Sequence, residues 1–303
     1  MDEQIHIIER INALRQERGA VILGHLYQRP EIQDLADFVG DSLDLSRKAR
    51  ETSADVIVFC GVFFMAESAK ILNPHKTVLL PNRRAGCPMA DMVTPEDVLA
   101  LRRQHPNAAV VCYVNSSAAV KAVSDICCTS SNAVKIVQSL REKEIIFIPD
   151  RNLGHYVSRF VKDKAFIFHP GYCNVHDRIT VSDIQVARAD HPGAMVLVHP
   201  ECRPEVVDTA DFTGSTAQII DHTVKSDHDS FIIGTECGVF HRLEQLSPKK
   251  RFYSVTGKLT CPNMKMTTLN DLLHALEEMV HPVELEPEII GKAAASLERM
   301  LAV

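Results

Sequence analysis

The sequence lacks the features that mark membrane-spanning, secreted and nucleic-acid-binding chains. Its longest apolar runs, such as residues 108–114, fall far short of the roughly 20 residues that a spanning helix needs. The first ten residues, MDEQIHIIER, are charged and amphipathic, so we expect no secretory signal and a cytoplasmic protein. Basic residues form no stripe, and the formal net charge is −6. We therefore expect neither nucleic acid nor membrane as a partner.

The nine cysteines include no Cys-x-x-Cys pair, so zinc ribbons and thioredoxin-like redox sites have no local signature. The odd number of cysteines argues against a disulfide framework. A chain of 303 residues can also build a hydrophobic core and does not need disulfides for stability. The composition, 46% hydrophobic and 24% charged, is that of a globular protein and excludes a disordered or collagen-like chain. Any metal site must be assembled from cysteines that are far apart in the sequence.

Three cysteines recur at nearly equal spacing, and each begins the same short pattern. Cys87, Cys173 and Cys261 are 86 and 88 residues apart. A threonine follows each cysteine by seven residues, and an aspartate follows each threonine by three. Thr-x-x-Asp before an apolar periodic run predicts a capped helix start. These starts are at Thr94 and Asp97, Thr180 and Asp183, and Thr268 and Asp271.

The repeat extends to strands and to further helix starts. Three apolar runs that are typical of strands end at His25, Tyr113 and His199, and a hydroxyl residue follows each by seventeen positions. We expect these hydroxyl residues to open amphipathic helices; they are Ser42, Ser130 and Thr216. Second strands are expected at 56–60, 145–149 and 231–234, and third strands at 77–82, 165–170 and 251–256.

Strands that alternate with helices predict an α/β protein with parallel sheets covered by helices. The repeat favours three similar three-layer αβα domains over two conventional domains. We expect the first domain at 1–86 plus 268–303, the second at 87–172 and the third at 173–267. A final amphipathic helix at 287–303 is expected to pack back on the first domain. Around a pseudo-threefold axis, the strand ends and the three repeated cysteines would converge on one cavity.

Three convergent thiolates suggest either of two metal centres. A [4Fe–4S] cluster usually has four cysteine ligands, so three would leave one iron open to act as a Lewis acid. Zinc would need a fourth ligand, most simply a histidine such as His176. The remaining six cysteines show no threefold pattern and are expected to be buried as small hydrophobes.

Eleven motifs in order along the chain resemble the quinolinate synthase family. They are GHLYQRPEIQDLADFVGDSLDLS (24–46), FCGVFFMAESAKIL (59–72), CPMADM (87–92), YVNSSAAVKA (113–122), CTSSNA (128–133), PDRNLGHYV (149–157), GYCNVH (171–176), VHPEC (198–202), GSTAQII (214–220), GTECGVFHRL (234–243) and CPNMK (261–265). The resemblance covers essentially the whole chain. It implies three α/β domains around a pseudo-threefold axis and a [4Fe–4S] cluster on Cys87, Cys173 and Cys261.

The resemblance also implies an activity. The family condenses iminoaspartate with dihydroxyacetone phosphate to give quinolinate, the pyridine precursor of NAD, with release of phosphate and water. L-Aspartate oxidase supplies iminoaspartate and is the implied functional partner. Substrates with two carboxylates and one phosphate would suit three helix N-termini, where free N–H groups and the helix dipole favour anions.

By the same resemblance, seven residues bind substrate: His25, Ser42, Tyr113, Asn115, Ser130, His199 and Thr216. His25 is also a candidate for catalysis. Glu201 is the candidate general base, for which burial is expected to raise the pKa. Tyr27 could orient a carbonyl or donate a proton. Four residues that follow second strands are placed near the cavity: Met65, Glu67, Asn152 and Glu236.

Three other functions remain open from the sequence. One is a different cluster-dependent hydro-lyase that acts on a hydroxy acid. Another is a redox or oxygen sensor, which would need a DNA- or protein-binding element that the sequence does not show. The third is a zinc-stabilised binding module.

Overall fold

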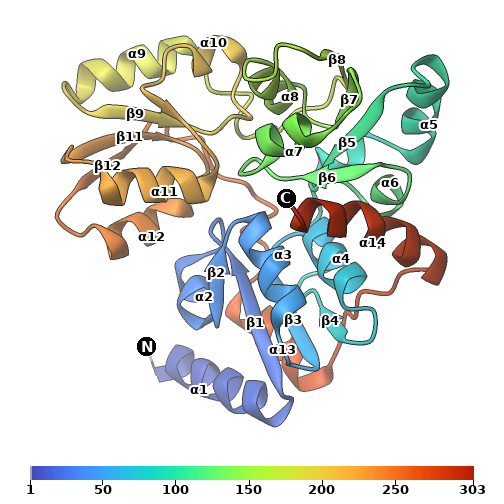
Figure 1. The fold of residues 1–303 in the computed structure, drawn as a ribbon. Coiled ribbons are helices and arrows are strands. Elements are labelled where there is room, and N and C mark those ends of the chain that lie inside the picture. Colours follow the sequence, from blue (N-terminus) through green and yellow to red (C-terminus); the bar gives the residue numbers. More distant parts are fainter. Residues whose placement is uncertain (1) are drawn as a thin grey trace. The chain divides into compact units, whose positions relative to one another are not determined.

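A computed structural model describes residues 2–303, and the side chains from residue 4 onward. The described residues form three β-sheets, and each sheet has four parallel strands flanked by helices (Figure 1). The predicted α/β class and the three similar αβα domains are therefore confirmed. We call the three sheets with their helices copies 1, 2 and 3, in chain order.

The elements of copy 1 are α1 (Asp2–Glu17), β1 (Ala20–His25), α2 (Pro30–Leu35), β2 (Phe38–Gly40), α3 (Ser42–Glu51), β3 (Val56–Cys60), α4 (Phe63–Leu72) and β4 (Thr77–Leu79). Those of copy 2 are the 3-10 turn Ala90–Met92, α5 (Pro95–Gln104), β5 (Ala109–Tyr113), α6 (Ala118–Ala122), β6 (Ile126–Cys128), α7 (Ala133–Ser139), β7 (Glu144–Ile148), α8 (Arg151–Ser158) and β8 (Ala165–Phe168). Those of copy 3 are α9 (Val181–Asp190), β9 (Met195–Val198), α10 (Pro204–Val207), β10 (Phe212–Thr213), α11 (Thr216–Lys225), β11 (Ser230–Gly234), α12 (Val239–Leu246) and β12 (Arg251–Ser254), and the chain ends with α13 (Leu269–Glu278) and α14 (Pro287–Leu301).

The strand order is the same in all three sheets: β2-β1-β3-β4, β6-β5-β7-β8 and β10-β9-β11-β12. The strands expected from the sequence are present, with ends that differ by a few residues. The sequence did not indicate the outer strands β2, β6 and β10, because two or three residues are too few to show a pattern. The inner strands are apolar and buried on both faces, as in β3 and β5, which is typical of parallel sheets covered by helices.

The helix starts after the three repeated cysteines are confirmed. Helices α5, α9 and α13 each begin with a complete capping box, in which the threonine hydroxyl accepts from the aspartate N–H and the carboxylate accepts from the threonine N–H. The caps are Thr94, Thr180 and Thr268. Equal spacing in the sequence therefore encodes the same local structure three times.

The predicted hydroxyl openings are confirmed for two of the other three helices and corrected for the third. Ser42 and Thr216 are the first helical residues of α3 and α11, and the residues before them, Asp41 and Ser215, provide the caps. Ser130 lies three residues before α7.

Packing contacts divide the chain into two compact units. Unit 1 is the chain up to Asp91 with Val114–Cys127 and Pro262–Ala302, and unit 2 is Met92–Tyr113 and Cys128–Cys261 with Val303. In unit 1, α13 packs against α1 and β3, and α14 packs against α4 and α6. The boundaries of the three domains stay a prediction. Within residues 2–303, no helix combines the length and apolar character that crossing a membrane requires.

Candidate active site

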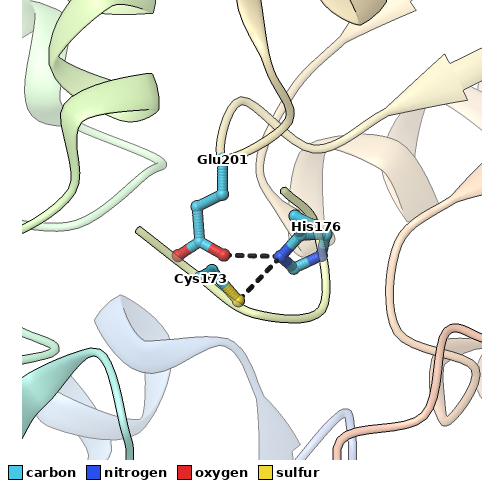
Figure 2. Close-up of side chains that lie close together, drawn as sticks. All are labelled: Cys173, His176 and Glu201. Atoms are coloured by element: carbon cyan, nitrogen blue, oxygen red, sulfur yellow. Dashed lines mark hydrogen bonds and ion pairs between the residues drawn. The ribbon is translucent and has the colours of Figure 1, made fainter. Parts of the chain in front are cut away.

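In unit 2, two loops bring a thiol, an imidazole and a carboxylate together. Cys173 and His176 lie on the loop between β8 and α9, and Glu201 lies just beyond the carboxyl end of β9. Ligand atoms of these three residues all lie within 4.8 Å of one another (Figure 2). Ligands of parallel α/β sheets bind at this end of the strands, so the position agrees with a functional site.

His176 lies at the centre of this group and is 1% exposed. Its Nδ1 is 2.6 Å from Oε2 of Glu201 and 3.3 Å from Sγ of Cys173 (Figure 2). Its Nε2 is 2.9 Å from the hydroxyl oxygen of Thr235, which follows β11. The His199 ring stacks on the His176 ring with centroids 4.6 Å apart. The imidazole is thus fixed from both edges and from one face.

Glu201 is ionised in this environment, contrary to our expectation. Burial alone raises its pKa, but the imidazoles of His199 and His176 and hydrogen bonds from His176 and Tyr113 lower the pKa to about 2. The nearest His199 nitrogen, Nδ1, is 3.5 Å from Oε2. Neighbouring hydrogen-bond donors, which the sequence did not reveal, therefore outweigh desolvation at this carboxylate.

The repeated cysteines differ in exposure from most of the others. Cys87, Cys173 and Cys261 are partly exposed, whereas five of the remaining six are buried, as predicted. Cys237 is the exception. In residues 2–303 no two cysteines form a disulfide. Cys173 and Cys261 both border the hydrophobic core of copy 3, so each thiol combines an apolar support with access to a ligand.

Two helix starts in unit 2 meet through their hydroxyl residues. Oγ of Ser131 donates to Oγ of Ser215 at 2.8 Å. Ser130 and Thr216, which were predicted to bind substrate, are the sequence neighbours of these two residues. Unit 2 thus brings together residues from copies 2 and 3 that are about 85 positions apart, which the sequence alone suggested only by symmetry.

In unit 1, His25 and Tyr27 form a compact pair at the carboxyl end of β1. The backbone N–H of Tyr27 donates to Nδ1 of His25 at 3.0 Å, and the two rings meet edge to face at 4.6 Å. Parallel pairing places His25 beside Gly40, two residues before Ser42. The predicted residues of copy 1 therefore lie at one end of one sheet.

Asn115 and Cys87 complete the predicted residues of unit 1. Oδ1 of Asn115 is buried and has no hydrogen-bond partner among the described residues, which is costly unless a ligand supplies a donor. Cys87 lines a cavity of about 720 Å³ together with Glu67.

The chain matches the family model described as Quinolinate synthetase A protein over residues 9–302. It is 52% identical to the quinolinate synthase of Clostridium kluyveri over 301 residues, covering 99% of each chain. It is 54% identical to the quinolinate synthase of Geobacter metallireducens over 297 residues, covering 98% of this chain and 97% of the relative. The chain belongs to the quinolinate synthetase A family.

Sequence reasoning missed two contributors to the site of this quinolinate synthetase A family member. Thr235 carried no signal of its own, because a threonine after a buried strand is common in any α/β protein. Asp177 holds the loop that follows Cys173: its carboxylate pairs with Arg151 at 3.1 Å and with Arg203 at 3.1 Å. Nδ2 of Asn152 donates to Asp177 and to the carbonyl of Glu201, at 2.9 and 3.0 Å.

The other residues placed loosely near the cavity have definite partners. Met65 is buried in α4. Glu67, on the same helix of this family member, accepts from the Ala118 N–H at 3.0 Å, and burial raises its pKa although Lys121 opposes the shift. Glu236 is fully buried and accepts backbone N–H groups beside Cys261.

Proposed function

We propose that the chain is a quinolinate synthase. It condenses iminoaspartate with dihydroxyacetone phosphate and releases quinolinate, phosphate and water for the synthesis of NAD. The reaction takes place in the cytoplasm, and L-aspartate oxidase supplies iminoaspartate. Family membership supports this proposal, and the group formed by the partly exposed Cys173 with the buried His176 and Glu201 is the observation that carries it.

A [4Fe–4S] cluster held by Cys87, Cys173 and Cys261 is part of the proposal. Three observations support it: the equal spacing, the partial exposure of these three thiols, and the burial of five of the other six. When bound, a cluster with three cysteine ligands supplies an iron with an open position, which can polarise a C–O bond and assist loss of water.

Residues at helix starts and after strands hold the anionic substrates. Ser42 and Thr216 are the first residues of α3 and α11, and their hydroxyls donate to a carboxylate or phosphate of the substrates. The unpartnered Oδ1 of Asn115 is an acceptor, and the amine or hydroxyl of a substrate supplies the donor that it needs. Holding two small reactants together replaces a bimolecular encounter by an effectively intramolecular one.

Glu201 accepts the proton that enamine formation releases. A carboxylate with a pKa of about 2 is ionised before each turnover but binds a proton weakly. The imidazoles of His176 and His199, at 2.6 and 3.5 Å, are the groups that share the proton with it. His25 and Tyr27 orient the substrate carbonyl, with the phenol as proton donor.

Analysis of the anaerobically purified protein tests the proposal most directly. We expect iron and sulfide in equal amounts, about four of each per chain, an absorption band of a [4Fe–4S] cluster, and quinolinate from the two substrates. Cys87→Ser should remove both cluster and activity, whereas Cys127→Ala, at a buried position, should keep both. Zinc without sulfide would contradict the cluster, and dehydration of a hydroxy acid without quinolinate formation would favour the hydro-lyase.

A further inference from the structure

Each repeated cysteine follows a loop that is tied to its sheet by the same backbone hydrogen bond. In each copy, a residue shortly after the second inner strand (β3, β7 or β11) donates its backbone N–H. The acceptor is the carbonyl of the residue two positions before the repeated cysteine. These bonds are Phe63 to Ala85 at 2.8 Å, Arg151 to Gly171 at 2.9 Å and Cys237 to Leu259 at 2.8 Å. The threefold repeat of the sequence is thus also a repeat in how the cysteine loops are attached.

At Gly171 this approach is so close that a side chain does not fit. A Cβ at that position would be 2.6 Å from the carbonyl oxygen of Pro149. Glycine is therefore required for the loop of copy 2 to reach the strand end.

In copies 2 and 3, a buried acidic side chain also faces the backbone of the cysteine loop, and in copy 3 it bonds the cysteine itself. Oε1 of Glu236 accepts the N–H of Cys261 at 2.9 Å, while Oε2 accepts the N–H of Gly238 at 2.6 Å. Oδ1 of Asp150 accepts the N–H of Leu153 at 2.8 Å; burial raises the pKa of Asp150 well above its usual range, and the backbone N–H of Cys173 is among the groups that oppose this shift. Both acids are 0% exposed, and each stands one residue before the donor of the repeated backbone bond.

Copy 1 has no acid at this position. The equivalent residue is Val62, which is buried and provides no side-chain cap for α4. A carboxylate is therefore not a general requirement of the turn after the second strand, because copy 1 forms the same backbone bond without one. The two acids distinguish the attachment of Cys173 and Cys261 from that of Cys87.

We propose that Asp150 and Glu236 are positioning residues for the metal centre, which fix the backbone of Cys173 and Cys261 so that the two thiolates are held ready for iron. The inference rests on the cluster of the proposed function. Neither acid is a metal ligand here: both act through the N–H of the ligand residue. Partners in this outer position commonly change metal affinity 10- to 100-fold when they are removed.

The test compares iron retention among variants of the full-length, anaerobically purified protein. Glu236→Ala and Asp150→Ala should release iron to a chelator about 10- to 100-fold faster than wild type. The reduced cluster should also show an altered electron paramagnetic resonance spectrum. Glu236→Gln and Asp150→Asn keep the side-chain shape and one acceptor oxygen, so we expect intermediate rates of iron release. They replace the alanine variants if those fail to fold.

Thr180→Ala is the matched control. It breaks the capping box of α9, seven residues after Cys173, but leaves the bond to the cysteine N–H in place. It should lose thermal stability while keeping the iron-release rate and the resonance spectrum of wild type.

Two results would overturn the inference, and they are distinguishable. In the first, wild type holds a cluster and the variants at both acids retain iron as wild type does, or Thr180→Ala releases iron as fast as those variants. The positioning role is then wrong while the proposed function stands. If wild type itself contains no iron and sulfide, the proposed cluster fails and this role fails with it.

Discussion

Nδ1 of His176 lies 2.6 Å from Oε2 of Glu201, and both side chains are almost completely buried. The same nitrogen is 3.3 Å from Sγ of Cys173, so one imidazole links a predicted metal ligand to the predicted proton acceptor. The sequence placed His176 near Cys173 but gave it no partner. In the structure it contacts Glu201 directly and, together with His199 and Tyr113, lowers the pKa of that carboxyl.

Glu201→Gln should separate metal binding from turnover. The amide keeps the size of the side chain but cannot take up a proton, so quinolinate formation should fall by 10²- to 10⁴-fold. Iron and sulfide should remain at the wild-type level, because Glu201 is not among the proposed ligands. Steady-state assays and metal analysis check this, with Glu205→Gln, an exposed acid on α10, as the control. A normal rate in Glu201→Gln would remove Glu201 from the reaction.

Thr235→Val should lower kcat more than it changes KM. The substitution deletes the hydroxyl 2.9 Å from Nε2 of His176, and the ring then loses the contact that fixes its outer edge. We expect kcat to fall about tenfold, which corresponds to about 1.4 kcal/mol. Thr235→Ser retains the hydroxyl and should restore the rate. Equal losses in the valine and serine variants would show that the hydroxyl alone does not account for the effect.

Asn115→Ala should weaken substrate binding without destabilising the fold. Oδ1 of Asn115 is buried without a partner in the described chain, so its removal costs no hydrogen bond in the unliganded protein. We expect a higher KM and an unchanged or higher Tm. Asn73→Ala is the contrast, because its buried Nδ2 donates to the carbonyls of Ala49 and Ala69, and its loss should cost about 1–3 kcal/mol. A large drop in Tm for Asn115→Ala would show that its amide supports the fold.

The capping box of α5 should be sensitive to acid. Hydrogen bonds from the Thr94 hydroxyl and then from the Thr94 N–H lower the pKa of Asp97 below its ordinary value of 3.8. The pKa of Asp97 is lower in the folded than in the unfolded protein, so the ionised carboxylate stabilises the fold above pH 3.8. This stabilisation is lost as the pH falls through the pKa of the folded state. Thr94→Ala should raise the pKa of Asp97 and cost about 1 kcal/mol at neutral pH. An NMR titration of the Asp97 carboxyl checks this, and an unchanged pKa would rule out the hydroxyl as its cause.

The sequence alone determined the local structure that recurs at fixed spacing. The capping boxes at Thr94, Thr180 and Thr268 depend only on residues three positions apart, so a single chain carries all the information needed to predict them. The inner strands were likewise predictable, since burial on both faces demands continuous apolar runs. The resemblance added the family, which the comparisons confirmed.

Only the tertiary structure decided how the site residues act on one another. Glu201 was expected to have a raised pKa because it is buried, but the imidazoles of His199 and His176 and hydrogen bonds from His176 and Tyr113 lower the pKa instead. Ser42 and Thr216 open their helices as expected, but only the structure shows that Asp41 and Ser215 cap these helices. Thr235 and Asp150 acquire their roles from contacts with residues that are 59 and 23 positions away. Hydrogen bonds and fields depend on distances in space, and spacing along a chain fixes those distances only within a single turn or strand.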